Sequence, residues 1–285
     1  MNRYLLLLSL TCLLYLQASA QGGDEVNPAD STGLPGDNFS LEGALELFKE
    51  SSSMEDFEQR LNTEANDVNN LDLDQNGEVD YVMVTDHAEG TVHAIVLQVA
   101  VNESEMQDVA VLELEKDGAE SAVIQILGDE ELYGESTILE PIEVGLKGNT
   151  PSGRGPAAPA YSAQFAVVNV WFWPSVRFVY APAYRPYVSP WGYRRHPGWF
   201  RPWRVNPWRW HRAHCARFRA HHHVVHTHRV VVAHKVYTPH RRTSVVVVTH
   251  NRGSRDRYRA THVHVVNPAP GPRRGKQGPK GGRGR

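Results

Sequence analysis

The chain has 285 residues, of which 41% are hydrophobic, and a formal net charge of -2 at pH 7. This length allows two ordinary domains, and the hydrophobic content excludes a chain that is too polar to fold. The small net charge hides a strong polarity. Residues 21–149 contain 31 Asp and Glu against 4 Lys and Arg, whereas residues 150–285 contain 25 Lys and Arg against one acid.

The first twenty residues have the pattern of a signal peptide. Arg3 gives a positive start, residues 5–16 are apolar, and residues 18–20 are small enough for a cleavage site. The apolar run is shorter than the roughly 20 residues that span a bilayer. We therefore predict a signal peptide at 1–20 and an exported protein without a transmembrane segment in its mature chain, located in the periplasm, outside the cell or at the envelope.

An acidic α+β domain is predicted at residues 39–144, after a flexible leader at 21–38. Ser40 and Ser53 are expected N-caps of two helices, because apolar residues recur after each at helical spacing. From residue 71 the period changes to that of strands, and the predicted strands are residues 79–86, 91–101, 109–115 and 122–127.

Polar turns at 88–90 and 116–118 are short, which favours antiparallel neighbours. The simplest assembly is an antiparallel β-meander with the two N-terminal helices packed on one face. Its predicted core strand positions are Val82, Val84, Ile95, Leu97, Val99, Val111, Leu112, Leu114, Ile124 and Ile126.

The most specific chemical pattern is the run from Asp72 to Asp80. Oxygen-bearing side chains at loop positions 1, 3 and 5 suit Ca²⁺, which takes six to eight oxygen ligands. Gly77 stands at position 6, where an unusual backbone conformation is needed. The alternative is an ordinary turn rich in Asp and Asn that leads into a strand.

This run resembles the EF-hand-like calcium loops of the D-x-D-x-[DN]-G type. The resemblance implies side-chain ligands from Asp72, Asp74, Asn76 and Asp80 and a carbonyl ligand from Glu78. A full EF-hand has an acid at position 12, where this chain has Met83, and a strand is expected to follow. The resemblance is therefore to the shorter, β-associated variant of extracellular proteins.

A linker is predicted at residues 145–160, followed by a largely disordered or low-complexity basic tail at 161–285. Repeated prolines exclude a long helix or central strand between residues 174 and 207. Interleaved aromatic and Arg residues suit an anionic polymer such as lipopolysaccharide, acidic polysaccharide or nucleic acid. Opposite charges further predict that the acidic and basic halves associate, within or between molecules, and separate in high salt.

Histidines are dense at residues 221–228 and could chelate Zn²⁺, Ni²⁺ or Cu²⁺ weakly through H-x-H pairs such as His226 and His228. Two valine runs, at 230–232 and 245–248, have high β-propensity and could add strands. The Gly- and Arg-rich end, residues 271–285, is expected to be disordered.

The sequence therefore favours a noncatalytic secreted or periplasmic calcium-binding protein with a polycationic, polymer-binding tail. No G-x-S-x-G, H-E-x-x-H, paired-Cys or phosphate-loop motif is present. The alternatives are a His-rich protein that binds or buffers transition metals, and an enzyme of unrecognised class. In general style the chain resembles exported proteins of Gram-negative bacteria, particularly the Bacteroidota, that join small acidic β domains to Trp-, Pro-, Arg- and His-rich ends. That resemblance implies no activity.

Overall fold

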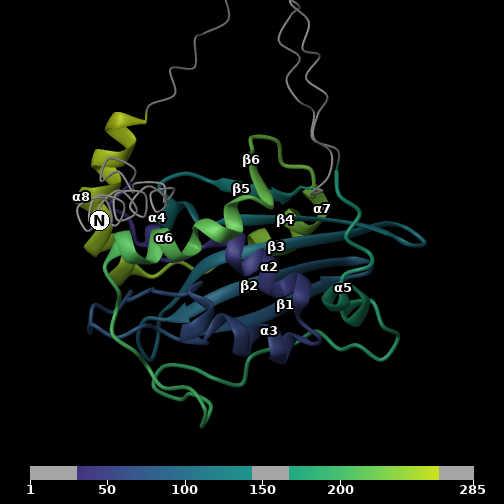
Figure 1. Ribbon diagram of the computed structural model, residues 1–285, viewed down its shortest axis with the longest axis horizontal. Coiled ribbons are helices and arrows are strands. Elements are labelled where there is room, and N and C mark those ends of the chain that lie inside the picture. The colour runs from purple at the N-terminus through teal and green to yellow at the C-terminus, as the bar shows by residue number, and fades with distance from the viewer. Residues whose placement is uncertain (1–30, 143–166, 263–285) are drawn as a thin grey trace, which may run out of the picture.

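The computed structural model describes residues 31–142 and 167–262 (Figure 1). The expected signal peptide, most of the leader, the expected linker and the Gly- and Arg-rich end lie outside these residues. The acidic half contributes η2 (Pro35–Asn38), α2 (Leu41–Glu50), α3 (Met54–Leu61), η3 (Glu64–Asn66), β1 (Val82–Glu89), β2 (Val92–Ala100), β3 (Met106–Gly118), β4 (Ser121–Gly128), α4 (Glu130–Tyr133) and β5 (Thr137–Pro141). The basic half contributes α5 (Pro174–Val179), α6 (Trp208–Arg219), β6 (His222–Val225), α7 (Val231–Tyr237), η4 (Thr238–His240) and α8 (Val245–Thr261).

A six-stranded antiparallel sheet in the order β1-β2-β3-β4-β5-β6 forms the centre of the molecule. The register places Ile95 of β2 beside Leu112 of β3, and Leu112 beside Ile126 of β4. Five strands come in sequence from the acidic half, and the basic half supplies β6 at the edge next to β5. The predicted α+β class, with helices and an antiparallel sheet, is confirmed.

The strand ends differ from the predicted ones by up to three residues, and β5 is not among the predicted strands. Two of the shifts have a clear cause. β1 begins at Val82 because the chain before it pairs elsewhere: the N–H of Val79 donates to the carbonyl of Trp203 at 2.8 Å. The turn after β3 lies at residues 119–120 rather than 116–118, because β3 continues to Gly118 through an irregularity after Lys116.

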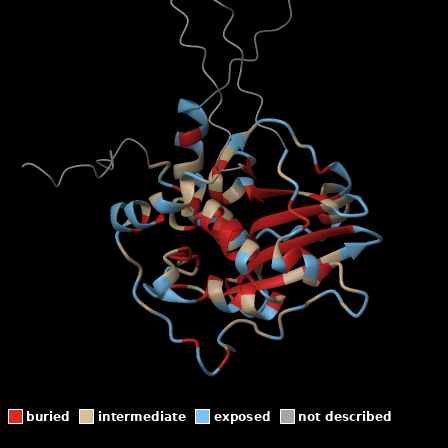
Figure 2. Ribbon diagram, turned by 45° about the vertical axis from the view of Figure 1, so that its right-hand side comes forward, coloured by how far each residue is buried: buried red, intermediate tan, exposed pale blue. Residues whose placement is uncertain are grey.

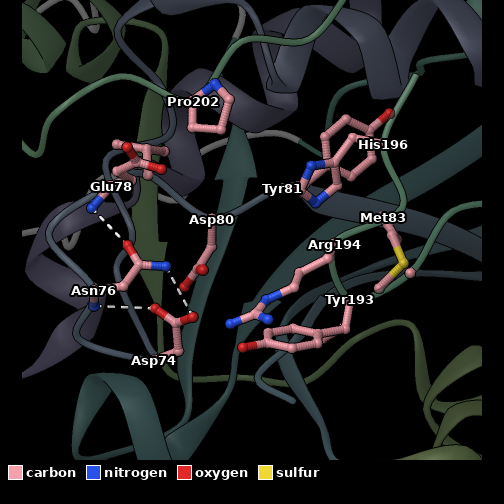
Figure 3. A pocket seen from close by; sticks show the side chains of 13 residues that line it. Asp74, Asn76, Glu78, Asp80, Tyr81, Met83, Tyr193, Arg194, His196 and Pro202 are labelled. Carbon is pink, nitrogen blue, oxygen red and sulfur yellow. Dashed lines mark hydrogen bonds between the residues drawn. The ribbon is translucent and has the colours of Figure 1, made fainter. Parts of the chain in front are cut away.

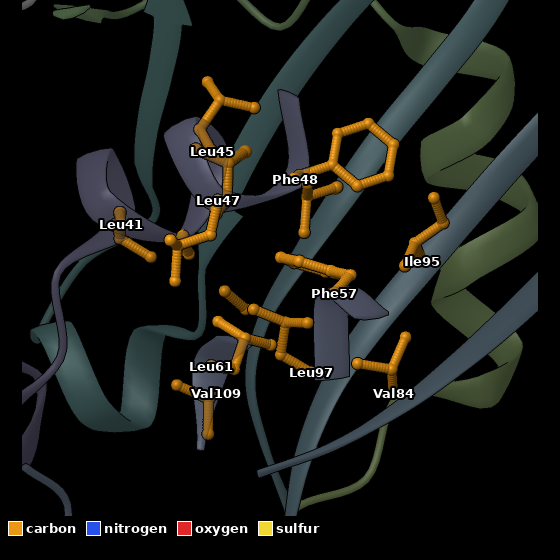
Figure 4. Packing of buried hydrophobic residues seen from close by; sticks show 14 of the residues in the cluster. Leu41, Leu45, Leu47, Phe48, Phe57, Leu61, Val84, Ile95, Leu97 and Val109 are labelled. Atoms are coloured by element: carbon orange, nitrogen blue, oxygen red, sulfur yellow. The ribbon is translucent and has the colours of Figure 1, made fainter. Parts of the chain in front are cut away.

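Helices α2 and α3 begin at the predicted caps. The side chain of Ser40 accepts the N–H of Gly43, and that of Ser53 accepts the N–H of Asp56. Both helices turn their apolar residues into a core shared with the sheet (Figure 4). In this core the rings of Phe48 and Phe57 meet edge to face, with centroids 5.3 Å apart.

The opposite face of the sheet is also covered, by α7. A second apolar cluster joins Tyr237 of this helix to the sheet residues Ala94, Val96, Val111, Leu127 and Ile138. Successive side chains of a strand point to opposite faces, so Val111 belongs to this cluster while its neighbour Leu112 belongs to the first. Figure 2 shows the resulting buried interior of the sheet.

The expectation of a largely disordered basic tail is wrong for residues 167–262. Val170, Trp171, Val176 and Val179 pack into the same core as α2 and α3, and β6 completes the sheet. The many prolines and the high charge of this segment favoured disorder. The apolar residues between the prolines and arginines are nevertheless numerous enough to pack against the sheet of the acidic half.

Both valine runs lie at helix starts rather than in strands. The N–H groups of Val232 and Ala233 donate to the Glu115 carboxylate at 2.7 and 2.8 Å, and the side chain of Ser244 accepts the N–H of Val247. Capping of free helix N–H groups and burial of one side of each helix override β-propensity, which depends strongly on context. Among the described residues, no helix combines the length and apolarity that crossing a membrane requires.

Candidate metal centre

The predicted calcium loop lies between η3 and β1 and is fixed at both ends. The N–H of Asp80 donates to the carbonyl of Leu71 at 2.7 Å, and the side-chain amide of Asn69 donates to the carbonyl of Asp80 at 2.8 Å. The carboxylate of Asp80 also accepts the N–H of Leu73 across the loop. These bonds close the loop, so its first and last acids face each other.

The turn inside the loop bends the chain around the first acid. The carboxylate of Asp72 accepts the N–H groups of Asn76 at 2.9 Å and Gly77 at 3.0 Å. Gly77 has φ +86°, a conformation that glycine adopts without a Cβ clash. Gly77 therefore has the backbone role that its position predicts.

Three of the five predicted ligands come together directly. Oxygens of Asp72, Asp74 and Asp80 lie within 4.8 Å of one another. Asn76 joins them through its amide, which donates to Asp74 at 2.9 Å, while its side-chain oxygen accepts the N–H of Glu78 at 2.7 Å.

Glu78 forms an isolated antiparallel bridge with Arg204 of the basic half. In this bridge the flanking groups make the bonds, from Val79 N–H to Trp203 and from Val205 N–H to Gly77. The carbonyl of Glu78 consequently points away from Arg204, on the same side as its own N–H. That side faces the loop, where the N–H already reaches Asn76.

Burial and repulsion from neighbouring carboxylates disfavour the charged forms of Asp80 and Asp72. Burial raises the pKa of Asp80 to about 7, and the charges of Asp74 and Asp72 add to the effect. Burial also raises the pKa of Asp72, although the Gly77 and Asn76 N–H groups oppose this. A bound cation would relieve the desolvation and the repulsion together.

A pocket of about 300 Å³ opens beside the loop. One wall carries Asp74 and Asp80, and the other carries Tyr193, Arg194 and His196 from the basic half (Figure 3). Arg194 extends toward the two acids, and its guanidinium group also lies 5.0 Å from the centre of the Tyr193 ring. Sequence reasoning missed these residues because more than a hundred positions separate them from the loop, and their only signal was the general Arg- and aromatic-rich composition.

The histidines of the tract at 221–228 lie in different surroundings and contact different partners. His222 is buried and lies 3.5 Å from the Glu46 carboxylate, whereas His226 is exposed. His228 contacts the carboxylate of Glu113, together with His234. His228 thus lies beside a histidine six positions later in the chain, and weak chelation by the His226 and His228 pair stays a prediction.

Cys215 and His211 form the most nucleophile-like pair in the described part of the chain. The sulfur lies 3.6 Å from His211 Nε2. Burial raises the pKa of the thiol to about 12 and lowers that of the imidazole to about 4. Both groups are consequently neutral near pH 7, which is the opposite of an activated thiolate.

The two groupings of acid and histidine side chains close enough to share a metal ion, in the described residues, are Asp72, Asp74 and Asp80 in one place and Glu113, His228 and His234 in another. The first is the predicted loop, and the second was not predicted. Comparison of the chain with models of known families, with curated proteins and with solved structures gives no match, so the case for function depends on the geometry of these groups.

Proposed function

We propose that this protein is a noncatalytic, exported calcium-binding protein whose basic half binds an anionic envelope or matrix polymer. The observation that carries the calcium assignment is the convergence of three carboxylates, from Asp72, Asp74 and Asp80, around a turn with glycine at position 6. Calcium prefers oxygen ligands in this kind of flexible loop.

The ligand set can be completed from the same loop. The side-chain oxygen of Asn76 and the carbonyl of Glu78 lie on the loop side of the chain, and waters from the adjoining pocket supply further oxygens. Six to eight oxygens at 2.3–2.6 Å are typical of Ca²⁺. The charge of the ion would offset the repulsion that raises the pKa of Asp80.

The polymer assignment is supported by the segment between α5 and α6. It exposes five arginines, and Arg209 at the start of α6 is exposed beside them. Trp199 in the segment and Trp210 in α6 are 44% and 40% exposed. The exposed arginines are Arg185, Arg194, Arg195, Arg201, Arg204 and Arg209. Guanidinium groups pair with sulfate, phosphate or carboxylate, and aromatic rings stack on sugars or bases.

The two parts of the proposal meet in the pocket of Figure 3. Without a cation, the acidic wall formed by Asp74 and Asp80 repels an anionic ligand, whereas with Ca²⁺ its charge is neutralised. Arg194 on the facing wall would then hold an acidic group close to the ion. We therefore expect polymer binding to be stronger with calcium than without it.

Thermal unfolding of the intact chain tests the calcium site. Because ligand binding to the native state raises stability, 10 mM Ca²⁺ should stabilise the wild type by about 1–3 kcal/mol relative to chelator, for a Kd of about 10⁻⁴–10⁻³ M. Asp74→Asn should remove most of this shift, and the exposed Asp117→Asn, on the turn end of β3, should retain it. Equal shifts in the wild type and Asp74→Asn, or no shift in the wild type, would refute the assignment.

Binding to dextran sulfate, with neutral dextran as control, tests the polymer surface. The affinity should fall with salt, as expected when cationic side chains displace counterions from a polyanion. The double variant Arg194→Gln/Arg201→Gln should bind more weakly, whereas Arg257→Gln on the exposed side of α8 should bind like the wild type. Equal binding to both dextrans, or equal affinity in both variants, would argue against this surface.

A further inference from the structure

We propose a second metal site, for Zn²⁺, formed by Glu113 of β3, His228 before α7 and His234 within α7. It lies on the α7 face of the sheet and shares no residue with the calcium loop. It also differs from the weak H-x-H chelation that the sequence suggests, because its ligands come from both halves of the chain.

The three side chains already face one another. His228 Nε2 contacts one oxygen of the Glu113 carboxylate, and His234 Nδ1 lies 2.8 Å from the other oxygen. The candidate ligand atoms lie within 4.8 Å of one another, and the imidazole centroids are 4.3 Å apart. Ligands in a tetrahedral zinc site are about 3.3 Å apart, given zinc–ligand distances of about 2.0–2.1 Å. Small side-chain rotations would suffice to close the site around an ion.

The carboxylate of Glu113 is held in the sheet. Its side chain is 0% exposed, and Gln125 lies opposite it on β4. Its described hydrogen-bonding partners are the two imidazoles rather than an arginine or lysine. A fully buried carboxylate without a full opposing charge is costly, and a divalent cation would compensate it.

The segment that carries His228 is anchored by Gln125. The side-chain oxygen of Gln125 accepts the N–H groups of Arg229 and Val230, and its amide donates to the carbonyl of Thr227 at 3.1 Å. These bonds fix the backbone on both sides of His228. The position of this ligand therefore does not depend on its contact with Glu113 alone.

The helix that carries His234 is anchored by Glu115. Its carboxylate accepts the N–H groups of Val232 and Ala233 in the first turn of α7. Ala233 and Val230 also pack on Val92 of β2, which holds the helix against the sheet. Both histidines thus come from backbone that the sheet fixes in place, as a preorganised metal site requires.

The chemistry of the ligand set selects zinc over calcium. Two imidazole nitrogens and one carboxylate oxygen match the three protein ligands of open zinc sites, whereas Ca²⁺ requires a shell of oxygens. The His228 and His234 side chains are 24% and 39% exposed, so an ion can enter and water can occupy the fourth position.

Zinc titration of the intact chain by calorimetry, with excess glycine as a weak competitor, tests the site. We expect one tight equivalent in the wild type, distinct from weaker binding by other histidines. His228→Gln, His234→Gln and Glu113→Gln should each weaken it by more than about 100-fold, since even outer-shell partners contribute about 10–100-fold. His226→Gln changes an exposed histidine of the same tract and should leave the tight equivalent unchanged.

X-ray absorption of the zinc-loaded wild type makes the test independent of variant folding. The proposal expects a shell of about four light atoms with scattering from two imidazoles. A shell with three or more imidazoles, or tight binding that persists in both histidine variants, would overturn it. Absence of a tight equivalent in the wild type would do the same.

Discussion

Asp108 shows how the acidic half uses its carboxylates. It is fully buried in β3, and one carboxylate oxygen accepts the hydroxyl of Tyr237 at 3.0 Å and the N–H of Arg242 at 2.9 Å. Other acids of the acidic half accept hydrogen bonds from the basic half in the same way: Glu58 from Ser189, Asp86 from Tyr184, Asp129 from Arg241 and Glu105 from Ser244. Several acids of the acidic half therefore bond groups of the basic half instead of interacting with solvent alone.

The titration of Asp108 predicts a pH dependence of stability. Burial raises its pKa from 3.8 to about 7 in the folded protein, so the folded state binds the proton more tightly than the unfolded chain. Protonation of Asp108 therefore adds to the free energy of unfolding at acidic pH, and this stabilisation is lost as the pH rises through about 7. Asp108→Asn keeps an acceptor for Tyr237 and Arg242 without the buried charge.

We therefore expect the wild type to lose more stability than Asp108→Asn between pH 5 and pH 8. The difference should be on the order of 2–3 kcal/mol, because one pKa unit corresponds to about 1.4 kcal/mol. Urea denaturation at pH 5, 6.5 and 8 measures it. Asp117→Asn, an exposed change on the same strand, should follow the wild type, and parallel profiles for all three proteins would refute the role of Asp108.

At the scale of elements, the end of α4 shows how closely α8 is packed. Gly134 caps α4 with φ +82°, and a Cβ at this position would collide with the ring of Tyr258 on α8. The hydroxyl of Tyr258 donates to Glu135 at 3.1 Å. A helix of the basic half is therefore fitted directly against a turn of the acidic half.

Substitution of two glycines separates backbone strain from this packing. Gly90, in the turn between β1 and β2, also has positive φ, at +62°, but a Cβ there would meet open space. Gly90→Ala should cost about 1 kcal/mol from strain, and Gly134→Ala should cost a further 1–3 kcal/mol or so from overpacking. Chemical denaturation of both variants measures the difference, and equal losses would mean that α8 does not pack against Gly134 in solution.

At the scale of the whole molecule, the two oppositely charged halves form one body. β6 extends the sheet of the acidic half, and Val79 bonds to Trp203 beside the calcium-like loop. Val247 of α8 and Trp171 belong to the same apolar cluster as α2 and α3. The association of the two halves therefore depends on backbone pairing and apolar burial as well as on opposite charge.

This architecture changes the expected response to salt. Halves held together by surface charge would separate in 1 M NaCl, where the Debye length is about 3 Å. Buried polar contacts are screened far less, and screening does not weaken apolar contacts. We expect the radius of gyration from small-angle scattering to be the same in 20 mM and 1 M NaCl. Expansion in high salt would show that surface charge, and not apolar contact, holds the two halves together.

The sequence by itself determined the local features, because their causes are local. Ser40 and Ser53 cap the predicted helices, the alternation of apolar residues produced the strands, and the Asp72–Asp80 pattern located one acid cluster. Each of these signals lies within about ten residues, where hydrogen-bonding geometry and hydrophobic period determine the outcome.

Only the tertiary structure decided the role of the basic half. Valine runs became the starts of α7 and α8 because Glu115 and Ser244 cap them, which strand propensity could not reveal. Likewise, Glu113 meets His234 across 121 positions of sequence, and Arg194 lines a pocket with Asp80. Contacts over such distances depend on how the sheet is covered on both faces, and no short pattern in the chain encodes that.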